Sequence, residues 1–96
     1  MTKALWIAHV NVLNADKLNA YAAAATPVIA AFGGVFLARG GAYEQLEGLE
    51  HTRNVVAQFP SLQAAHDCYY SEKYQAAIKL GEGGFRRSLI IVESIE

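Results

Sequence analysis

Near the start of the chain, a run of apolar residues is interrupted by polar ones only at His9 and Asn11, which favours a β-strand. Residues 4–13 are rich in aliphatic side chains, and residues 14–16 then favour a turn and the start of a helix. Successive side chains of a strand point to opposite faces, so this strand carries two different rows. The apolar row comprises Trp6, Ala8, Val10 and Val12, and the mixed row comprises Leu5, Ile7, His9, Asn11 and Leu13. We expect the face with the apolar row to pair with a second copy of the chain and the face with the mixed row to hold any ligand site. The pattern does not fix which row meets the helices.

The next segment has the three- and four-residue spacing of an amphipathic helix. Asn14 is a good N-cap, and one face is then apolar at Leu18, Tyr21, Ala22, Ala25, Ile29 and Phe32. Pro27 lacks an N–H group and clashes with the preceding turn, so the helix is predicted to kink or break near Thr26. Gly33 and Gly34 are expected to end it, because glycine readily adopts the left-handed conformation of a C-terminal cap.

Shorter apolar runs between glycines and prolines predict the remaining elements. Further strands are predicted at residues 35–39, 53–59 and 89–95, and residues 43–47 are either a continuation after a bulge or a short edge strand. Ser61 and Ser71 are predicted N-caps of two helical segments. Their buried sides carry Leu62, Ala65, Cys68, Tyr69, Tyr74, Ala77 and Ile78. The order βαββαβ predicts a two-layer α+β domain.

The first and last strands are apolar on both faces. In the last strand, Leu89 and Ile91 lie opposite Ile90 and Val92. A lone two-layer domain would have a polar outer sheet face. Each exposed large apolar side chain costs roughly 1.5–3 kcal/mol relative to burial, so a handful would match the stability of a small domain. We therefore expect a homodimer, with a mass near twice that of the 10.4 kDa chain.

The composition supports an oligomer and excludes several other partners. Hydrophobic residues make up 53% of the 96 residues and charged residues only 18%, which leaves little polar surface for an isolated domain. The net charge of -1 and the lack of a basic run predict neither a nucleic-acid nor a membrane partner. Cys68 is the single cysteine, so neither a disulfide nor a paired zinc site is expected, which suits a cytoplasmic location.

Four short segments, taken together, resemble those of a known family. They are residues 36–41 (FLARGG), 46–48 (LEG), 59–61 (FPS) and 69–75 (YYSEKYQ). On these motifs the chain resembles the domain of unknown function 1330 family, within the dimeric α+β-barrel superfamily of ferredoxin-like folds. The resemblance implies one ferredoxin-like two-layer sandwich over residues 1–96, with an antiparallel four-stranded sheet. It also implies a homodimer whose sheets face each other and a pocket between sheet and helices. The family has no settled activity, although its superfamily includes small monooxygenases and isomerases.

Six residues are candidates for binding a ligand: His9, Tyr21, Arg39, Arg53, Tyr69 and Tyr74. Arg39 ends its strand on the face expected to carry Val35 and Leu37, and a guanidinium there suits a carboxylate or an enolate. An ion pair with Glu44 or Glu47 across the turn is the structural alternative. The tyrosines lie at buried helical positions, where they either pack in the core or line a pocket.

His9 is expected to lie against the helices, either as a group that titrates near neutral pH or as an imidazole with a backbone or tyrosine partner. The three histidines lack the close spacing of metal ligands, so no metal is predicted. Residues 81–84 follow a helix, so their glycines are not a dinucleotide fingerprint, and no cofactor is expected.

Two functions remain open at this stage. The first is a dimeric protein that binds a small anionic or aromatic molecule, with Arg39 as its anchor. The alternative is a cofactor-free enzyme, similar to a monooxygenase or an isomerase, with His9 as acid or base. A cavity of roughly 300 Å³ shared by Arg39 and His9 would favour a ligand site, whereas Arg39 paired with Glu47 in a filled layer would argue against one.

Overall fold

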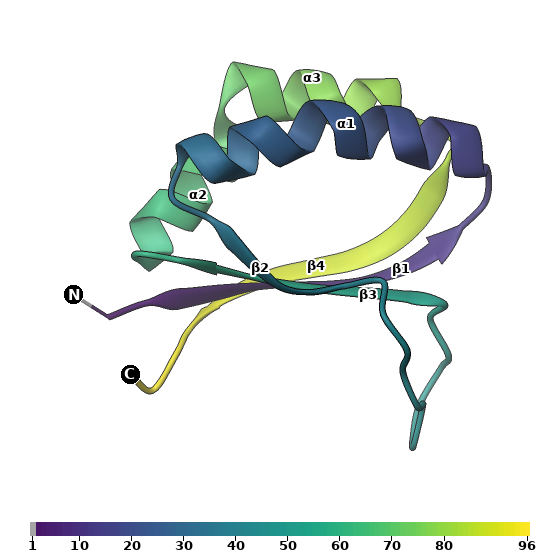
Figure 1. Ribbon diagram of the computed structural model, residues 1–96, viewed down its shortest axis with the longest axis horizontal. Coiled ribbons are helices and arrows are strands. Elements are labelled where there is room, and N and C mark those ends of the chain that lie inside the picture. The colour runs from purple at the N-terminus through teal and green to yellow at the C-terminus, as the bar shows by residue number, and fades with distance from the viewer. Residues whose placement is uncertain (1) are drawn as a thin grey trace.

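A four-stranded sheet with helices on one face makes up the fold of the computed structural model, which describes residues 2–96 (Figure 1). The elements are β1 (Ala4–Val12), α1 (Ala15–Ala31), β2 (Val35–Arg39), β3 (Arg53–Phe59), α2 (Leu62–Tyr70), α3 (Glu72–Leu80) and β4 (Phe85–Glu93). The strands lie in the order β2-β3-β1-β4, and every neighbouring pair is antiparallel. The predicted ferredoxin-like βαββαβ order is confirmed, with the second helical segment divided into α2 and α3.

The three predicted helix N-caps are confirmed by their hydrogen bonds. The side chain of Asn14 accepts from the backbone N–H of Lys17 at 3.1 Å. Ser61 and Ser71 do the same for the N–H groups three residues ahead of them, at 3.0 and 3.2 Å. Each helix therefore begins where a side-chain oxygen satisfies a backbone donor that has no partner within the helix.

The predicted break at Pro27 is wrong, because α1 runs without interruption through the proline. Val28 and Ile29 are both buried against the core, and this burial stabilises the last turn of the helix. The hydroxyl of Thr26 donates to the carbonyl of Ala22 at 2.7 Å, within the same helix.

Two strand predictions also need correction. Residues 43–47 form no strand, and the connection from β2 to β3 projects away from the helices (Figure 1). Tyr43 donates a hydrogen bond to the Glu50 carboxylate at 2.5 Å, which ties the two sides of this connection together. The last strand begins at Phe85 rather than at residue 89, because residues 85–88 pair with the second half of β1.

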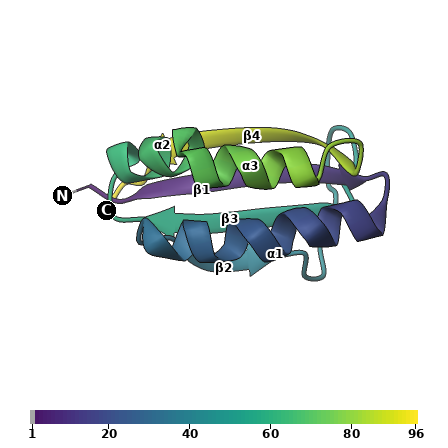
Figure 2. The same ribbon diagram turned by 90° about the horizontal axis from the view of Figure 1, so that it is seen from above.

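The apolar row of β1 faces the helices. Trp6, Ala8 and Val10 are at most 4% exposed, whereas His9 in the mixed row is exposed on the other face. The expected position of His9 against the helices is therefore wrong. Seen from above, α1 lies over β2 and β3, and α3 lies over β1 and β4 (Figure 2). The core between the two layers includes the side chains of Trp6, Phe59, Cys68 and Tyr74, all fully buried.

The outer face of the sheet, which no helix within residues 2–96 covers, carries a group of aliphatic side chains. Ile7 and Ile90 pair across β1 and β4 on this face, and Leu5 pairs with Val92. Ile90 is 56% exposed, so a large aliphatic side chain meets solvent in a single copy of the chain. Within residues 2–96, no helix has the length and apolar character needed to cross a membrane.

Candidate functional site

A small cavity lies between α1 and the sheet, next to Trp6. Its floor includes Ala8 and Val10 of β1, and its roof includes Ala22 and Ala25 of α1. These side chains are too short to fill the space between the two layers. The cavity has a volume of about 40 Å³, which is room for a few water molecules.

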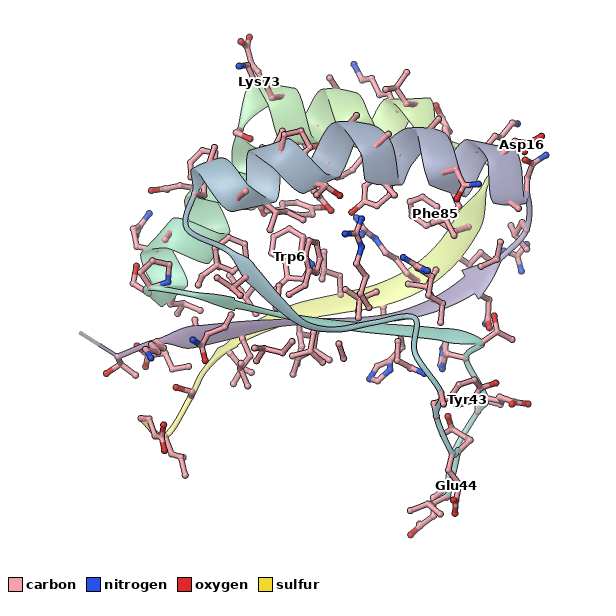
Figure 3. All side chains as sticks on the ribbon, in the orientation of Figure 1. Trp6, Asp16, Tyr43, Glu44, Lys73 and Phe85 are labelled. Carbon is pink, nitrogen blue, oxygen red and sulfur yellow. The ribbon has the colours of Figure 1, made fainter. Side chains whose placement is uncertain are left out.

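Three arginines line this cavity from three different strands. Val10 pairs with Arg53 on one side and with Arg87 on the other, so these two arginines flank it in the same row of the sheet. Arg39 pairs with Val55 in the adjacent row. Nitrogen-tipped side chains accordingly gather below α1 between Trp6 and Phe85 (Figure 3). The three guanidinium groups share one cavity although they are far apart in the sequence.

A β-bulge turns Arg39 toward the helices. The pairing of β2 with β3 shifts between Phe36 and Ala38, so that Leu37 is the additional residue. Phe36 and Arg39 then share the helix-facing side, and the prediction that Arg39 shares the face of Val35 and Leu37 is wrong. A bulge places two residues opposite one, which reverses the alternation beyond it.

The partner of Arg39 is a hydroxyl rather than a carboxylate. Its Nη2 donates to Thr26 Oγ1 at 2.7 Å, and its guanidinium carbon lies 4.4 Å from the centre of the Phe36 ring. The expected alternative, an ion pair with Glu44 or Glu47, does not form; among residues 2–96 the pair within ion-pair distance is His66 Nδ1 and Asp67 Oδ1, 3.5 Å apart. The charge of Arg39 is therefore not neutralised by the protein.

Arg87 is fixed by a pair of tyrosines. It donates to the hydroxyl of Tyr21 at 3.0 Å and to that of Tyr74 at 3.1 Å, and the two hydroxyls are hydrogen-bonded to each other. Burial lowers the pKa of Arg87, but the adjacent hydroxyls outweigh it and the net direction is upward. Burial raises the pKa of Tyr74, so this phenol stays neutral beside the cation. The network holds a charged guanidinium in a fixed orientation.

Arg53 lies against the backbone of Gly40. A Cβ added at Gly40 would come within 2.5 Å of Arg53 Nη1, and this glycine has a φ of +70°. Its N–H donates to the carbonyl of Asn54 at 2.9 Å, which closes the end of the β2–β3 pairing. Glycine is thus needed here both for the backbone conformation and for the close approach of the guanidinium.

The structure brings together four of the six residues expected from the sequence. Tyr21, Arg39 and Arg53 line the cavity, and Tyr74 reaches it through Arg87. Tyr69 does not line the cavity. Its ring packs against Trp6, with 6.1 Å between the ring centres.

His9 is separated from the cavity by the sheet. Its Nδ1 lies 2.7 Å from Asn54 Oδ1, and its ring lies 5.5 Å from that of His51 on the outer face. The cavity shared by His9 and Arg39 that would have favoured a ligand site is therefore absent from residues 2–96.

Arg87 was not among the residues singled out from the sequence. It precedes the predicted start of the last strand, so the sequence did not assign its side chain to either face of the sheet. The signal was present, since extending the alternation of Ile91 and Leu89 back by two residues places Arg87 on the helix-facing side.

The charge balance of the cavity indicates what it can bind. Three of the eight basic residues of the chain line it, and none of the nine acidic residues does so within residues 2–96. Phe36, Phe85 and Tyr21 add aromatic surface. No group of three or more metal-ligating side chains occurs in the same part of the chain. The site is suited to an anion with an apolar body.

Solved structures share this architecture at low sequence identity. The RPA0582 protein of unknown function from Rhodopseudomonas palustris is 18% identical, with a TM-score of 0.82 over 99% of this chain and 84% of that one. The cofactor-independent oxygenase SnoaB from Streptomyces nogalater is 8% identical, with a TM-score of 0.72 over 100% and 96%. A dimeric protein of unknown function and ferredoxin-like fold from Bacteroides fragilis is 15% identical, with a TM-score of 0.62 over 96% of both chains. At these identities the similarity shows the fold alone.

The comparison by sequence is more specific than the comparison by fold. No curated protein matches the chain. The model of one family matches residues 3–95, which includes all seven helices and strands and every residue of the arginine-lined cavity. The chain therefore belongs to the family described as Domain of unknown function (DUF1330).

Proposed function

We propose that this domain binds a small organic anion with an apolar or aromatic body in the cavity between α1 and the sheet. The observation that carries the proposal is the convergence of Arg39, Arg53 and Arg87 on one cavity that no acidic side chain of residues 2–96 lines. Like charges brought together in a partly buried site repel one another. An anion relieves this repulsion and accepts the forked hydrogen bonds that guanidinium groups donate.

The lining of the cavity favours an organic ligand over an inorganic ion. Phe36 and Phe85 present aromatic rings, and Ala8 and Val10 present a flat apolar floor. Ligand sites are typically apolar surfaces with a few polar anchors that set the orientation. The apolar surface would contact the body of the ligand while the arginines hold its acidic group.

Binding requires movement of the Arg53 head. The cavity of about 40 Å³ is far smaller than the roughly 300–1,000 Å³ of typical ligand sites. Arg53 is half-buried and can swing toward solvent on its flexible stem. Arg39, held by Thr26, and Arg87, held by two tyrosines, would stay in place as fixed anchors.

Calorimetric titration with carboxylates and their neutral amides tests the proposal. Benzoate, hexanoate and isophthalate should bind, whereas benzamide, hexanamide and isophthalamide should bind more weakly or not at all. Arg39→Gln should weaken carboxylate binding by about tenfold, because a charge-assisted hydrogen bond contributes roughly 1.5–3 kcal/mol. Lys79→Gln is the control for net charge, since Lys79 is exposed on α3 and lines neither the cavity nor the outer face of the sheet.

Two results would contradict this function. One is that none of the three carboxylates binds better than its amide. The other is that Arg39→Gln and Lys79→Gln weaken binding equally, because the effect would then come from net charge rather than from the cavity.

We also propose that the functional unit is a homodimer in which a second copy covers the outer face of the sheet. The aliphatic side chains on that face support this, as does the related fold of the dimeric Bacteroides fragilis protein. Light scattering should give a mass near twice 10.4 kDa. Ile90→Lys should shift the protein to the monomer, whereas Leu80→Lys, on α3 at a similar 57% exposure, should not. A wild-type monomer at micromolar concentration would refute the dimer.

The positions of the residues give less support to catalysis through His9. The sheet separates His9 from Arg39, and the imidazole already has Asn54 as a hydrogen-bond partner. An anion held by Arg39 would therefore lie on the opposite face of the sheet from this base. The comparison with a cofactor-independent oxygenase extends to the fold only.

A further inference from the structure

The positive charge of the cavity is spread along α1 and is not focused at one point. The Arg87 head is attached to α1 at Tyr21, and the Arg39 head is attached at Thr26. These positions are five residues apart in the sequence, which corresponds to about 7–8 Å along a helix axis. Arg53 and Arg87 lie on the two strands that flank β1, so their backbones are about two strand spacings, roughly 10 Å, apart.

Sites for a single compact anion have a different construction. A phosphate group is commonly held at a helix N-terminus, where several backbone N–H groups point at it. Tyr21 and Thr26 lie inside α1, where the backbone N–H groups are engaged in the helix. One compact group could contact one guanidinium head fully, but the other anchored head would keep its unpaired charge.

We propose that the ligand is a small dicarboxylate, with one carboxylate at Arg87 and the other at Arg39. This inference rests on the proposed function and narrows its ligand class. A dianion leaves one positive charge in the cavity, whereas a monoanion leaves two. Arg53, between these two ends at the level of Val10, would contact the body or either carboxylate of the ligand.

Hydroxyl groups orient Arg39 and Arg87, the two arginines that would each hold a carboxylate. A guanidinium has five N–H donors, and Arg39 uses one of them on Thr26. Arg87 uses two on Tyr21 and Tyr74. Hydroxyl partners set the direction of each head without neutralising it, so donors remain on both for a forked contact with a carboxylate.

Binding of isophthalate, benzoate and inorganic phosphate to the full chain, at one pH and one ionic strength, tests the inference. Isophthalate and benzoate share one ring and differ by one carboxylate. Isophthalate should bind at least about tenfold more tightly than benzoate, because it gains a second charge-assisted contact. It should also bind more tightly than phosphate.

Variants assign the second carboxylate to its partner. In Arg39→Gln the affinity for isophthalate should fall to the level of benzoate, whereas Lys79→Gln should still bind isophthalate more tightly than benzoate. Arg87→Gln should have the same effect as Arg39→Gln. If loss of the tyrosine contacts unfolds the Arg87 variant, the Arg39 variant still decides the question, because Arg39 is exposed and its substitution spares the core.

The outcomes distinguish a failure of the dicarboxylate inference from a failure of the proposed anion-binding function. Equal affinities for benzoate and isophthalate would overturn the dicarboxylate and leave the anion-binding function standing. Phosphate binding as tightly as isophthalate would also overturn it, because a single compact group would then suffice. If neither carboxylate binds better than its amide, the proposed function fails as well.

Discussion

The layer between helices and sheet has two halves that differ in kind. Around Trp6 the space is filled by rings, with Phe59 at 5.5 Å and Tyr74 at 5.2 Å between ring centres. Around Val10, four residues after Trp6 on β1, the space is bordered by small side chains and three guanidinium groups. We call these the aromatic half and the arginine half. Both halves are built on β1 and β3.

The difference follows from the size of a few side chains on β1 and α1. The helix-facing row of β1 falls from Trp6 to Ala8, and α1 places Ala22 and Ala25 above it. A large ring fills the layer and contributes to stability, whereas alanines leave room that arginine stems can border. Tyr74 connects the two halves, because its ring packs on Trp6 while its hydroxyl accepts from Arg87. Stability and binding are thus assigned to neighbouring parts of one core.

The largest expected effect tests whether the aromatic half provides most of the stability. Trp6→Ala should lower the free energy of unfolding by about 3–5 kcal/mol, because it leaves a cavity among buried rings. Val10→Ala, in the same row of the arginine half, should cost only about 1–2 kcal/mol. Urea unfolding followed by far-UV circular dichroism measures both. Equal losses would show that the two halves do not differ in this respect.

A second, smaller effect should appear at alkaline pH in the aromatic half. Burial raises the pKa of Cys68, which belongs to the core around Trp6, from 9.0 to about 11. Below pH 9 the thiol is neutral in both states. Between about pH 9 and 11 the unfolded chain releases this proton while the folded chain retains it, so stability falls as pH rises.

Urea unfolding at pH 8 and pH 10.5 measures this effect. The wild type should lose roughly 1–2 kcal/mol more over this interval than Cys68→Ala. Arg39→Gln should behave like the wild type, since a guanidinium does not titrate in this range. If Cys68→Ala and the wild type lose the same stability, the thiol is not the source.

The fold could be predicted from local patterns because each element carries its own signal. Asn14, Ser61 and Ser71 mark three helix starts, and all three act as caps in the structure. Errors arose where the tertiary structure outweighs the local signal. Pro27 should break a helix, but the burial of Val28 and Ile29 keeps α1 continuous.

The site was only partly predictable, because its geometry depends on pairing between strands. Tyr21, Arg39 and Arg53 were identified by residue type and by resemblance, and all three line the cavity. The face of Arg39 depends on a bulge that has no clear mark within residues 35–39. The position of His9 required knowing which row of β1 meets the helices, and two rows with several apolar residues each do not decide this.

The smallest expected effect tests whether the arginine half depends on the glycine pair after β2. Gly40 has a φ of +70° and lies against Arg53 Nη1, whereas a Cβ at Gly41 would meet no atom within 4 Å. Gly40→Ala should therefore displace the Arg53 head and weaken isophthalate binding by a few-fold, in line with the modest contribution of one partly exposed contact. Gly41→Ala should bind like the wild type. Calorimetric titration of both variants decides the point: equal affinities would mean that Arg53 finds its place without the glycine, and that the anchored heads of Arg39 and Arg87 define the site by themselves.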